Sequence, residues 1–381
     1  MARIGIDARY LENETTGLGR YSYNLLVHLL EQDRKNTYRV LIRETYTGNL
    51  PSQPNVIYVR VPYPPISLAS LFALSRRVRN LELDLWHAHF PVAPLFSGTP
   101  FLVTVHDLQP LRVPAMGGRR PLPLRVAYRA YYPLVYAASL SFSRAIVAVS
   151  IATCEEIQDV FRIPREKIHV IHEALDDRFS PEGLPTHFDP GDKRHALPSR
   201  FLLYVGATLP HKNLDTLLKG FAKALRQPGT GDLGLVIAGR PSRFDSQWTN
   251  LAQRLGIVEH IHRIGHVAHE DLSGLYNQAV ALVHVCRYEG FGFPTLEAMQ
   301  HGLPVIAASH TSLPEVVGTS ALLVEPGDVN GIARAIGKAL HDEALCNRLR
   351  KHGEANLKRF LWKDAAAKTL SLFETVLGSP C

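Results

Sequence analysis

Two glutamates, Glu289 and Glu297, flank the glycine-rich string Gly290-Phe291-Gly292-Phe293-Pro294. Glycines let backbone N–H groups approach a ligand closely, and proline suits the first turn of a helix. Amides at a helix start favour an anion or a hydroxyl-rich ligand, and a carboxylate often holds ribose hydroxyls. We therefore predict a site for an anionic or hydroxyl-rich ligand here, with the two carboxylates on different hydroxyls. The alternative is a helix start whose acids are favoured only by the helix dipole.

A second candidate loop begins at Gly206 and carries a lysine, in the string Gly206-Ala207-Thr208-Leu209-Pro210-His211-Lys212-Asn213. At the start of a helix, Lys212 can pair with a diphosphate as a point charge, whereas the alternative is a solvated surface lysine. His211, when protonated beside phosphates, and Arg240 in the segment IAGRPS are candidates for additional positive charge.

Two further candidates lie in the first half of the chain. Gly17 and Gly19 follow an apolar run and open a helical pattern, so their amides could bind a diphosphate or an acceptor; the alternative is a tight turn that needs positive φ. His106 directly follows the apolar run Phe101–Val105, where side chains face the ligand in such sheets. The alternative for His106 is a sheet-edge histidine bonded to Asp107.

The sequence does not favour a metal or disulfide site. His87 and His89 share one strand face without a third ligand type nearby, and no Asp-x-Asp string occurs. We therefore expect Lys212 and helix-start amides, rather than Mg²⁺, to meet the charge of a bound diphosphate, with no metal and no cofactor. The cysteines are far apart and form no CxxC pair, which disfavours zinc and a disulfide framework: Cys154, Cys286, Cys346 and Cys381.

The elements that position these residues alternate between short apolar runs and segments of helical period, which predicts parallel sheets covered by helices. The segment Asp176–Pro198 has no period and is rich in Pro, Gly, Asp and His, so we expect a linker at 176–198. We predict an α/β chain with two Rossmann-like doubly wound domains, 1–175 and 199–360, facing across a cleft that holds the site. A final helix, within 361–381, is expected to pack back across the domain junction. The expected strands are Arg3–Ala8, Tyr38–Ile42, Val56–Val59, Leu83–Ala88, Phe101–Val105, Ala145–Val149, Ile168–Ile171, Phe201–Gly206, Leu233–Ala238, Ala279–Val285 and Pro304–Ala307.

Composition narrows the class of protein. The 381 residues are 46% apolar and 20% charged, which excludes a disordered, collagenous or coiled-coil chain. The net charge, 42 − 35 = +7, favours anionic partners, but the absence of a Lys/Arg tract argues against nucleic acid. The first residues begin a strand pattern without the apolar core of a signal peptide, so we expect a cytoplasmic protein.

The segment 112–144 combines arginines with aromatic residues and contains no Asp or Glu. Such a mixture suits the headgroup zone of an anionic membrane, so we expect peripheral contact with the inner face of a membrane. The alternative is an ordinary helix with a basic face. The arginines are Arg112, Arg119, Arg120, Arg125, Arg129 and Arg144, and the aromatics are Tyr128, Tyr131, Tyr132, Tyr136 and Phe142.

The chain resembles the retaining, GT-B-fold glycosyltransferases of family 4, also called glycosyl transferases group 1. The resemblance rests on the spacing Glu289-x7-Glu297 with GFG between, followed by EAMxxGxPVI, and covers nearly the whole chain. Other matching segments are IDARYLENETTGLGRYSYNLL at the start, VTVHDLQPLR at 103–112, AVSIATCEEI at 148–157, YVGATLPHKNLDTLL at 204–218 and GDVNGIARAI at 327–336. By the IDAR start, the HDLxPL segment and the PxKN loop, it is most similar to bacterial GDP-mannose-dependent mannosyltransferases of polysaccharide assembly.

The resemblance implies roles for individual residues. Glu297 would hold the ribose, Glu289 would contact the donor sugar near the reacting centre, and His106 would touch that sugar and help align the acceptor. Gly290, Phe291 and Gly292 would offer amides to sugar and phosphate, and the base would rest on the loop 264–267, which includes Val267. Relatives often carry an arginine at the positions of Ala207 or His211, so this chain departs from the usual phosphate-binding pattern.

The implied activity is that of a retaining hexosyltransferase of the EC 2.4.1 type. It would move mannose from GDP-mannose to a glycan or lipid-linked saccharide, with Lys212, Glu289 and His106 at the catalytic centre. Three alternatives stay open at this point: a UDP-sugar donor within the same family, a sugar-nucleotide epimerase or a phosphorylase on the same fold, and a non-catalytic sugar-nucleotide-binding subunit.

Overall fold

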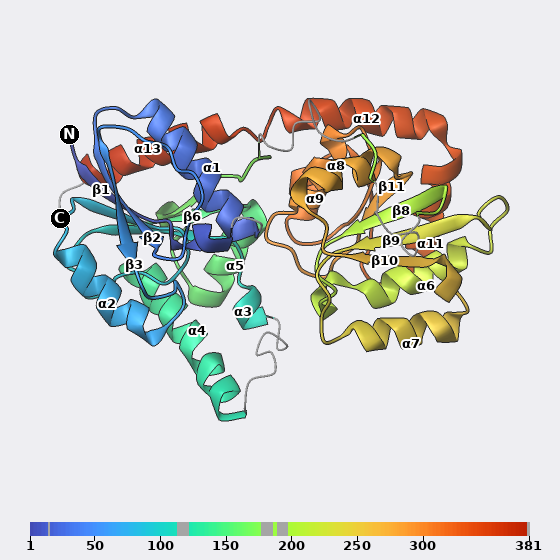
Figure 1. The fold of residues 1–381 in the computed structure, drawn as a ribbon, viewed down its shortest axis with the longest axis horizontal. Helices are drawn as coiled ribbons and strands as arrows, with labels where there is room; N and C mark the ends of the chain where they lie inside the picture. The colour runs from blue at the N-terminus through green and yellow to red at the C-terminus, as the bar shows by residue number, and fades with distance from the viewer. Residues whose placement is uncertain (14–15, 113–121, 177–185, 189–196, 379–381) are drawn as a thin grey trace. The chain divides into compact units, whose positions relative to one another are not determined.

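The computed structural model describes residues 1–13, 16–112, 122–176, 186–188 and 197–378. The chain divides into two compact units, Met1–Ala174 with Phe360–Cys381, and Leu175–Arg359. Most of the expected linker, 177–185 and 189–196, lies outside the described residues. Figure 1 shows that each unit is a parallel sheet covered by helices.

The first unit is built on a seven-stranded sheet of order β3-β2-β1-β4-β5-β6-β7, in which every pair is parallel. The order reverses between β1 and β4, which is the topological switch point of this sheet. The strands are β1 Arg3–Asp7, β2 Thr37–Arg43, β3 Val56–Val61, β4 Leu85–Ala88, β5 Phe101–Val105, β6 Ala145–Ala148 and β7 Ile168–Val170. The helices are α1 Gly17–Gln32, α2 Leu68–Arg79, α3 Gln109–Arg112, α4 Leu122–Phe142, α5 Ile151–Phe161 and α13 Trp362–Gly378, with the 3-10 turns η1 Arg9–Asn13 and η3 Arg165–Lys167.

The second unit repeats this plan with six parallel strands in the order β10-β9-β8-β11-β12-β13. Its switch point lies between β8 and β11. The strands are β8 Arg200–Val205, β9 Leu233–Ala238, β10 Ile261–Gly265, β11 Ala281–His284, β12 Val305–Ala308 and β13 Ala321–Val324. The helices are α6 Leu214–Ala224, α7 Asp245–Leu255, α8 His269–Gln278, α9 Phe293–Gln300, α10 Leu313–Val317, α11 Val329–His341 and α12 Glu343–Leu357, with the turns η6 Pro210–Lys212 and η7 Val258–His260.

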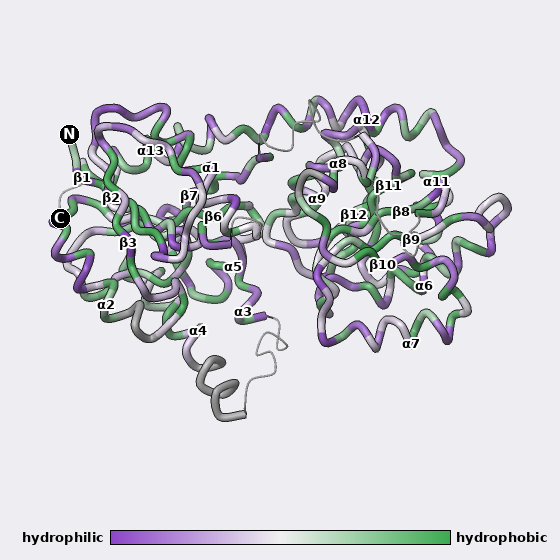
Figure 2. The backbone as a smooth tube through the Cα atoms, viewed as in Figure 1, coloured by the Kyte–Doolittle hydropathy of each residue, from purple (hydrophilic) through white to green (hydrophobic). Residues whose placement is uncertain are grey.

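The apolar runs form these strands because both faces of each sheet are covered, so that strands such as β5 and β9 are buried along their whole length. Figure 2 shows this apolar character concentrated on the strands of both units. The expected strands are confirmed, whereas β10 and β13 were not predicted.

The C-terminal helix α13 belongs to the first unit, where it packs along α1. The rings of Tyr21 and Trp362 lie 5.7 Å apart, and Gln32 Nε2 donates to the carbonyl of Lys363 at 2.9 Å. This packing explains the apolar stripe of α13, which covers α1 and reaches His87 through Phe373. A helix that follows the second unit in sequence, and whose Lys363 lies 331 residues after Gln32, therefore completes the first unit.

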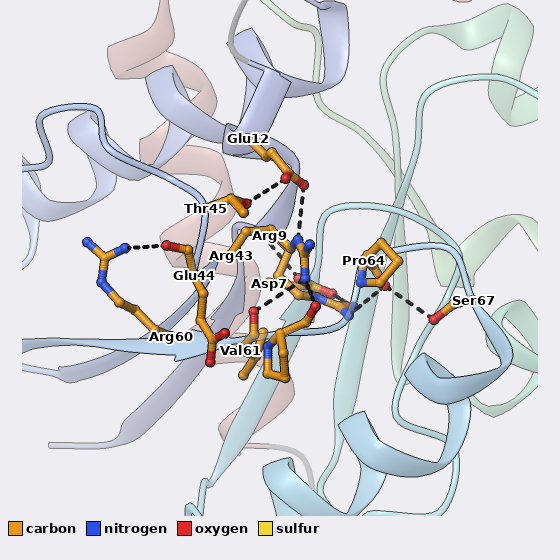
Figure 3. A network of polar contacts seen from close by, with 11 residues as sticks. Asp7, Arg9, Glu12, Arg43, Glu44, Thr45, Arg60, Val61, Pro64 and Ser67 are labelled. Carbon is orange, nitrogen blue, oxygen red and sulfur yellow. Dashed lines mark hydrogen bonds and ion pairs between the residues drawn. The ribbon is translucent and has the colours of Figure 1, made fainter.

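A polar network closes the carboxyl end of β1, within the IDAR string (Figure 3). The guanidinium of Arg9 is fully buried. It donates two parallel hydrogen bonds to the Asp7 carboxylate, from Nε to Oδ1 at 2.7 Å and from NH2 to Oδ2 at 2.6 Å. Arg9 NH1 also donates to the carbonyl of Pro64 at 3.3 Å, which ties the segment after β3 to β1. Because Asp7 is buried as well, removing either residue would leave the other as a buried charge without its counter-ion.

Part of the Arg- and Tyr-rich segment faces inward. Tyr136 is fully buried and contacts Phe90 edge to face, while Arg112 pairs with Glu156 at 2.7 Å. Leu134 and Phe142, which lie in α4 like Tyr136, are 70% and 72% exposed. The residues 113–121, with Arg119 and Arg120, lie outside the described residues, as do the side chains of Arg125, Tyr128 and Arg129. In the described part of the chain, no helix has the length and apolar character needed to cross a membrane.

Candidate active site

Lys212 and Glu289 meet at the switch point of the second unit. Lys212 lies in η6, after β8, and Glu289 lies in the loop between β11 and α9. Because β8 and β11 are parallel neighbours, the segments after them leave the same edge of the sheet. Lys212 Nζ donates to Glu289 Oε2 at 2.7 Å, with 18% and 16% of the two side chains exposed. The sequence predicted both residues as ligand-binding, and the structure brings them together.

The Lys212 loop is held in place by contacts that leave little freedom. Asn213 adopts φ 63°, and its Nδ2 donates to the carbonyls of Val285 and Pro326, each at 2.7 Å. At the other end, Gly206 and Gly239 approach so closely that a Cβ on Gly239 would lie 1.9 Å from the Gly206 carbonyl oxygen. The loops that follow β8, β9 and β11 are thus locked to one another.

The Glu289 carboxylate is stabilised by three donors on one oxygen. Besides Lys212, His284 Nε2 lies 2.8 Å from Oε2, and Cys286 Sγ lies 3.8 Å from it. Burial by itself would raise the pKa of Glu289, but the Lys212 charge and the His284 hydrogen bond outweigh it and lower the pKa well below its usual range. Glu289 is therefore ionised, and among the described residues its Oε1 has no hydrogen-bond partner.

His284 and Cys286 were not predicted. His284 ends β11 and is buried, with its Nδ1 unpartnered among the described residues. Burial, followed by the charge on Glu289, raises the pKa of the Cys286 thiol, so it is a protonated, weak donor. A histidine at the last position of a buried apolar strand is the one sequence signal that could have identified this contact.

His284, Cys286 and Glu289 also form the one group of three metal-type ligands among the described residues, with ligand atoms within 4.8 Å of one another. The Lys212 ammonium already occupies the Glu289 oxygen that a cation would take. Burial raises the pKa of the Cys286 thiol, so a metal could bind this sulfur only with release of its proton. The donor set therefore fits an ammonium better than a divalent cation.

Glu297 lies one turn into α9 and is only 2% exposed. Its Oε2 accepts a hydrogen bond from the Tyr276 hydroxyl at 2.7 Å, and the Tyr276 ring stacks on His301 at 5.4 Å. Tyr276, in α8, was not predicted. The Tyr276 hydroxyl is a neutral donor to the Glu297 carboxylate, whereas the Glu289 carboxylate accepts from the Lys212 ammonium.

The glycine string between the two glutamates forms the start of α9. Gly292 has φ 111°, and a Cβ there would lie 2.6 Å from Leu313 Cδ2, so both conformation and space require glycine. Ser312 Oγ donates to the carbonyls of Glu289 and Phe291 at 3.1 and 3.0 Å. The Phe291 side chain is buried. The string Gly290–Gly292 is therefore a rigid turn that can offer a ligand its backbone rather than side chains.

The remaining predicted residues of this unit differ in what they can contribute. His211 is buried, and burial together with the Lys212 charge lowers its pKa to about 4, so it carries no charge at neutral pH. Arg240 is exposed after β9, and Val267 is buried after β10. Gly206 has φ 142° and lies at the carboxyl end of β8, at the switch point of the sheet.

In the first unit, Gly17 and Gly19 begin α1 after β1, as expected. Thr16 caps this helix: its Oγ1 accepts from the Gly19 amide at 3.2 Å and donates to the carbonyl of Asn13 at 2.7 Å. Gly17 is exposed and Gly19 is buried. The Gly19 amide is therefore already used within the helix cap.

His106 follows β5, and both of its ring nitrogens have partners. Nδ1 lies 2.6 Å from Glu173 Oε1, and Nε2 lies 3.0 Å from the backbone oxygen of His89. Asp107, the partner considered from sequence, instead accepts from the Gln109 amide at 2.9 Å. Glu173 was not predicted, because 67 residues separate it from His106.

His87 and His89 are buried core residues. His87 Nε2 lies 2.9 Å from Thr104 Oγ1, which also contacts the Tyr21 hydroxyl at 3.0 Å. His89 Nδ1 lies 3.1 Å from Ser22 Oγ. Burial, followed by the charge on His106, lowers the pKa of His89 to about 3, so it is neutral. The two rings contact each other at 4.8 Å as part of the packing beneath His106.

Comparisons with known proteins identify the family of the chain. The family model "Glycosyltransferase Family 4" matches residues 15–179, and "Glycosyl transferases group 1" matches residues 187–356. The chain is 31% identical over 237 residues to O-antigen chain mannosyltransferase B of Escherichia coli, a match that spans 62% of each chain.

Two solved structures share the whole fold. The sucrose-phosphate synthase of Thermosynechococcus elongatus superposes with a TM-score of 0.73 at 20% identity over 100% of both chains. Anabaena HepE, in complex with UDP and glucose, superposes with a TM-score of 0.69 at 18% identity over 98% of this chain and 100% of HepE. From the two matched family models and this two-sheet architecture, the chain belongs to the glycosyl transferases group 1, glycosyltransferase family 4, and has the GT-B fold.

Proposed function

We propose that this protein transfers mannose from GDP-mannose to a glycan or lipid-linked saccharide, with retention of the anomeric configuration. The observation that carries the proposal is the Lys212–Glu289 pair at the carboxyl ends of β8 and β11, where open α/β sheets bind ligands. The mannosyl donor is supported by the likeness to O-antigen chain mannosyltransferase B. The match spans 62% of that relative's length.

Lys212 is proposed to stabilise the leaving group. When the bond from the anomeric carbon to the phosphate oxygen breaks, negative charge grows on the diphosphate, and an ammonium fixed beforehand stabilises it without reorganisation. Because His211 is neutral, it supplies no second charge. The rigid amides before α9 are the groups that supplement Lys212, which makes the reaction independent of a divalent cation.

Glu289 is proposed to act on the sugar. Its Oε2 is taken by Lys212 and His284, while Oε1 can accept a hydrogen bond from a hydroxyl of the donor. An ionised carboxylate at this position also stabilises the positive charge that develops on the sugar in an oxocarbenium-like state. The acceptor hydroxyl then attacks the anomeric carbon from the face that the diphosphate leaves, and its proton passes to the departing phosphate oxygen.

Glu297 is proposed to hold the ribose, for which its fixed carboxylate one turn into α9 is suited. The guanine base is assigned to the loop that includes Val267. Within the family fold, a UDP-sugar is the rival donor, since HepE binds UDP and glucose.

A transfer assay tests this function. The purified protein is incubated with GDP-mannose or UDP-glucose, without divalent cation, and with mannose-containing oligosaccharides as acceptors. We expect a product one mannose larger by mass, with an axial α linkage by NMR, and loss of product in Lys212→Met. Nucleotide release without an extended acceptor would indicate an epimerase or hydrolase, and binding without turnover would indicate a non-catalytic subunit.

Peripheral contact with the inner face of a membrane is proposed for α4. Leu134 and Phe142 are exposed apolar side chains, and Arg144, two residues after Phe142, is also exposed, which suits an anionic headgroup zone. Sedimentation with anionic vesicles tests this contact. We expect binding that weakens with salt and that is reduced in Leu134→Ser/Phe142→Ser; equal binding by this variant would contradict it.

A further inference from the structure

Three strands of the first unit bring their carboxyl ends to His106. His106 follows β5, His89 follows the neighbouring β4, and Glu173 follows β7 on the other side. The backbone oxygen of His89 and the carboxylate of Glu173 therefore approach the imidazole from opposite sides, at 3.0 and 2.6 Å. The side chain of His106 is 11% exposed and that of Glu173 is 4% exposed.

The chemistry of these two partners restricts the protons on the ring. A backbone carbonyl accepts only, so Nε2 must carry a hydrogen. A carboxylate also accepts only, and a free carboxyl group is more acidic than a free imidazole by about two pK units. The proton shared by the Glu173 carboxylate and the His106 imidazole therefore belongs on Nδ1. With a hydrogen on each nitrogen, the ring is an imidazolium and Glu173 is its counter-ion.

The other groups that the structure records around the ring are neutral or bound to another partner. Tyr21, from α1, contacts the ring edge to face at 4.6 Å, and burial raises the pKa of its hydroxyl, so it is neutral. His87 and His89 are kept neutral by burial, which lowers their pKa values. From α5, Thr153 Oγ1 donates to the backbone oxygen of His106 and accepts from Ser150 Oγ, and Asp107 accepts from the Gln109 amide.

We infer that Glu173 is a positioning residue that holds His106 as a fixed, doubly protonated cation at the carboxyl end of β5. His106 then acts as a positive charge and not as a general base, because neither ring nitrogen has a free lone pair. The use of this charge in sugar transfer rests on the proposed function. The protonation state itself does not depend on it.

Glu173→Gln keeps the shape and a hydrogen-bond acceptor but removes the counter-charge. Glu166→Gln, at an exposed position of η3 in the same unit, is the matched control. Histidine ¹⁵N spectra of the whole protein, with His106→Gln used to assign the signal, report both ring nitrogens directly. We expect two protonated nitrogens at about pH 8 in wild type and in Glu166→Gln, and one in Glu173→Gln.

The pH profile of transfer supplies the functional readout. The ratio of kcat/KM for Glu173→Gln to that for Glu166→Gln should fall roughly 100-fold between about pH 5.5 and pH 8.5, as an ordinary imidazole loses its proton. A ratio that does not change with pH would overturn the functional part of the inference. An unprotonated ring nitrogen in wild type at pH 8 would overturn all of it. If every variant and the wild type fail to transfer sugar, the proposed function fails while the spectra still decide the state of His106.

Discussion

Replacing Glu289 by glutamine removes one charge from the centre of the candidate site. Lys212 Nζ and His284 Nε2 donate to the same carboxylate oxygen, at 2.7 and 2.8 Å. A hydrogen bond to a charged group contributes about 1.5–3 kcal/mol, against about 0.5–1.5 kcal/mol for a neutral one. Two such bonds are weakened, and the lysine is left without its counter-ion, so Glu289→Gln should lower the free energy of unfolding by about 2 kcal/mol. The midpoint of the second unit should fall by about 4–8 °C.

The pH dependence of this loss has a definite sign. The folded pKa of Glu289 lies well below the ordinary glutamate value, because Lys212 and His284 outweigh burial. Its ionised form therefore stabilises the fold above the unfolded pKa of about 4.3 and loses this contribution as the pH falls through the folded pKa. The difference between wild type and Glu289→Gln should be constant from about pH 6 to 8 and should shrink below about pH 4.3.

Thermal unfolding of three proteins at several pH values measures the effect. The control is Glu259→Gln, the same change at an exposed position in the same unit, which should unfold like wild type. Transfer activity of Glu289→Gln should fall by about 100-fold or more. Equal stability of Glu289→Gln and wild type at about pH 7, or a difference that grows in acid, would refute the electrostatic account of this site.

Three other outcomes are expected. Arg9→Leu should cost about 3–5 kcal/mol of unfolding free energy by leaving Asp7 buried and uncompensated, and urea titration should show that adding Asp7→Asn recovers part of the loss. Gly239→Ala forces a Cβ against the Gly206 carbonyl, so calorimetry should show weakened GDP binding and differential scanning fluorimetry a lower unfolding midpoint. Because the pKa of His211 is lowered to about 4, GDP affinity should change equally in wild type and His211→Gln between about pH 6 and 7.5; a steeper rise in wild type towards acid would show that His211 is protonated beside the phosphates.

The strands and the ligand-binding loops could be predicted from local sequence. Apolar runs such as Leu233–Ala238 leave few alternatives to a buried parallel strand. The doubly wound order then places the loops that carry Lys212 and Glu289 at the same edge of the sheet. Both residues were predicted for this reason, since loop chemistry and topology point to one place.

Contacts between distant segments could not be predicted in this way. Nothing near His106 indicates Glu173, and the helix pattern of 269–278 does not reveal that Tyr276 holds Glu297. The partners of a buried charge depend on which strands become neighbours and on how far each loop extends. The same holds for Tyr136, whose place in an Arg- and Tyr-rich segment suggested a surface but which packs inside.

Binding of nucleoside diphosphates tests the central claim most directly. Thermal unfolding of wild type and Lys212→Met is followed with GDP, UDP and ADP, each at about 1 mM without metal. A ligand at about 100 times its dissociation constant stabilises by about 2.7 kcal/mol, a shift of several degrees. We predict a shift with GDP that is absent in Lys212→Met. A shift with UDP alone would contradict the donor, and no shift, or an equal shift in Lys212→Met, would contradict the site at the ends of β8 and β11.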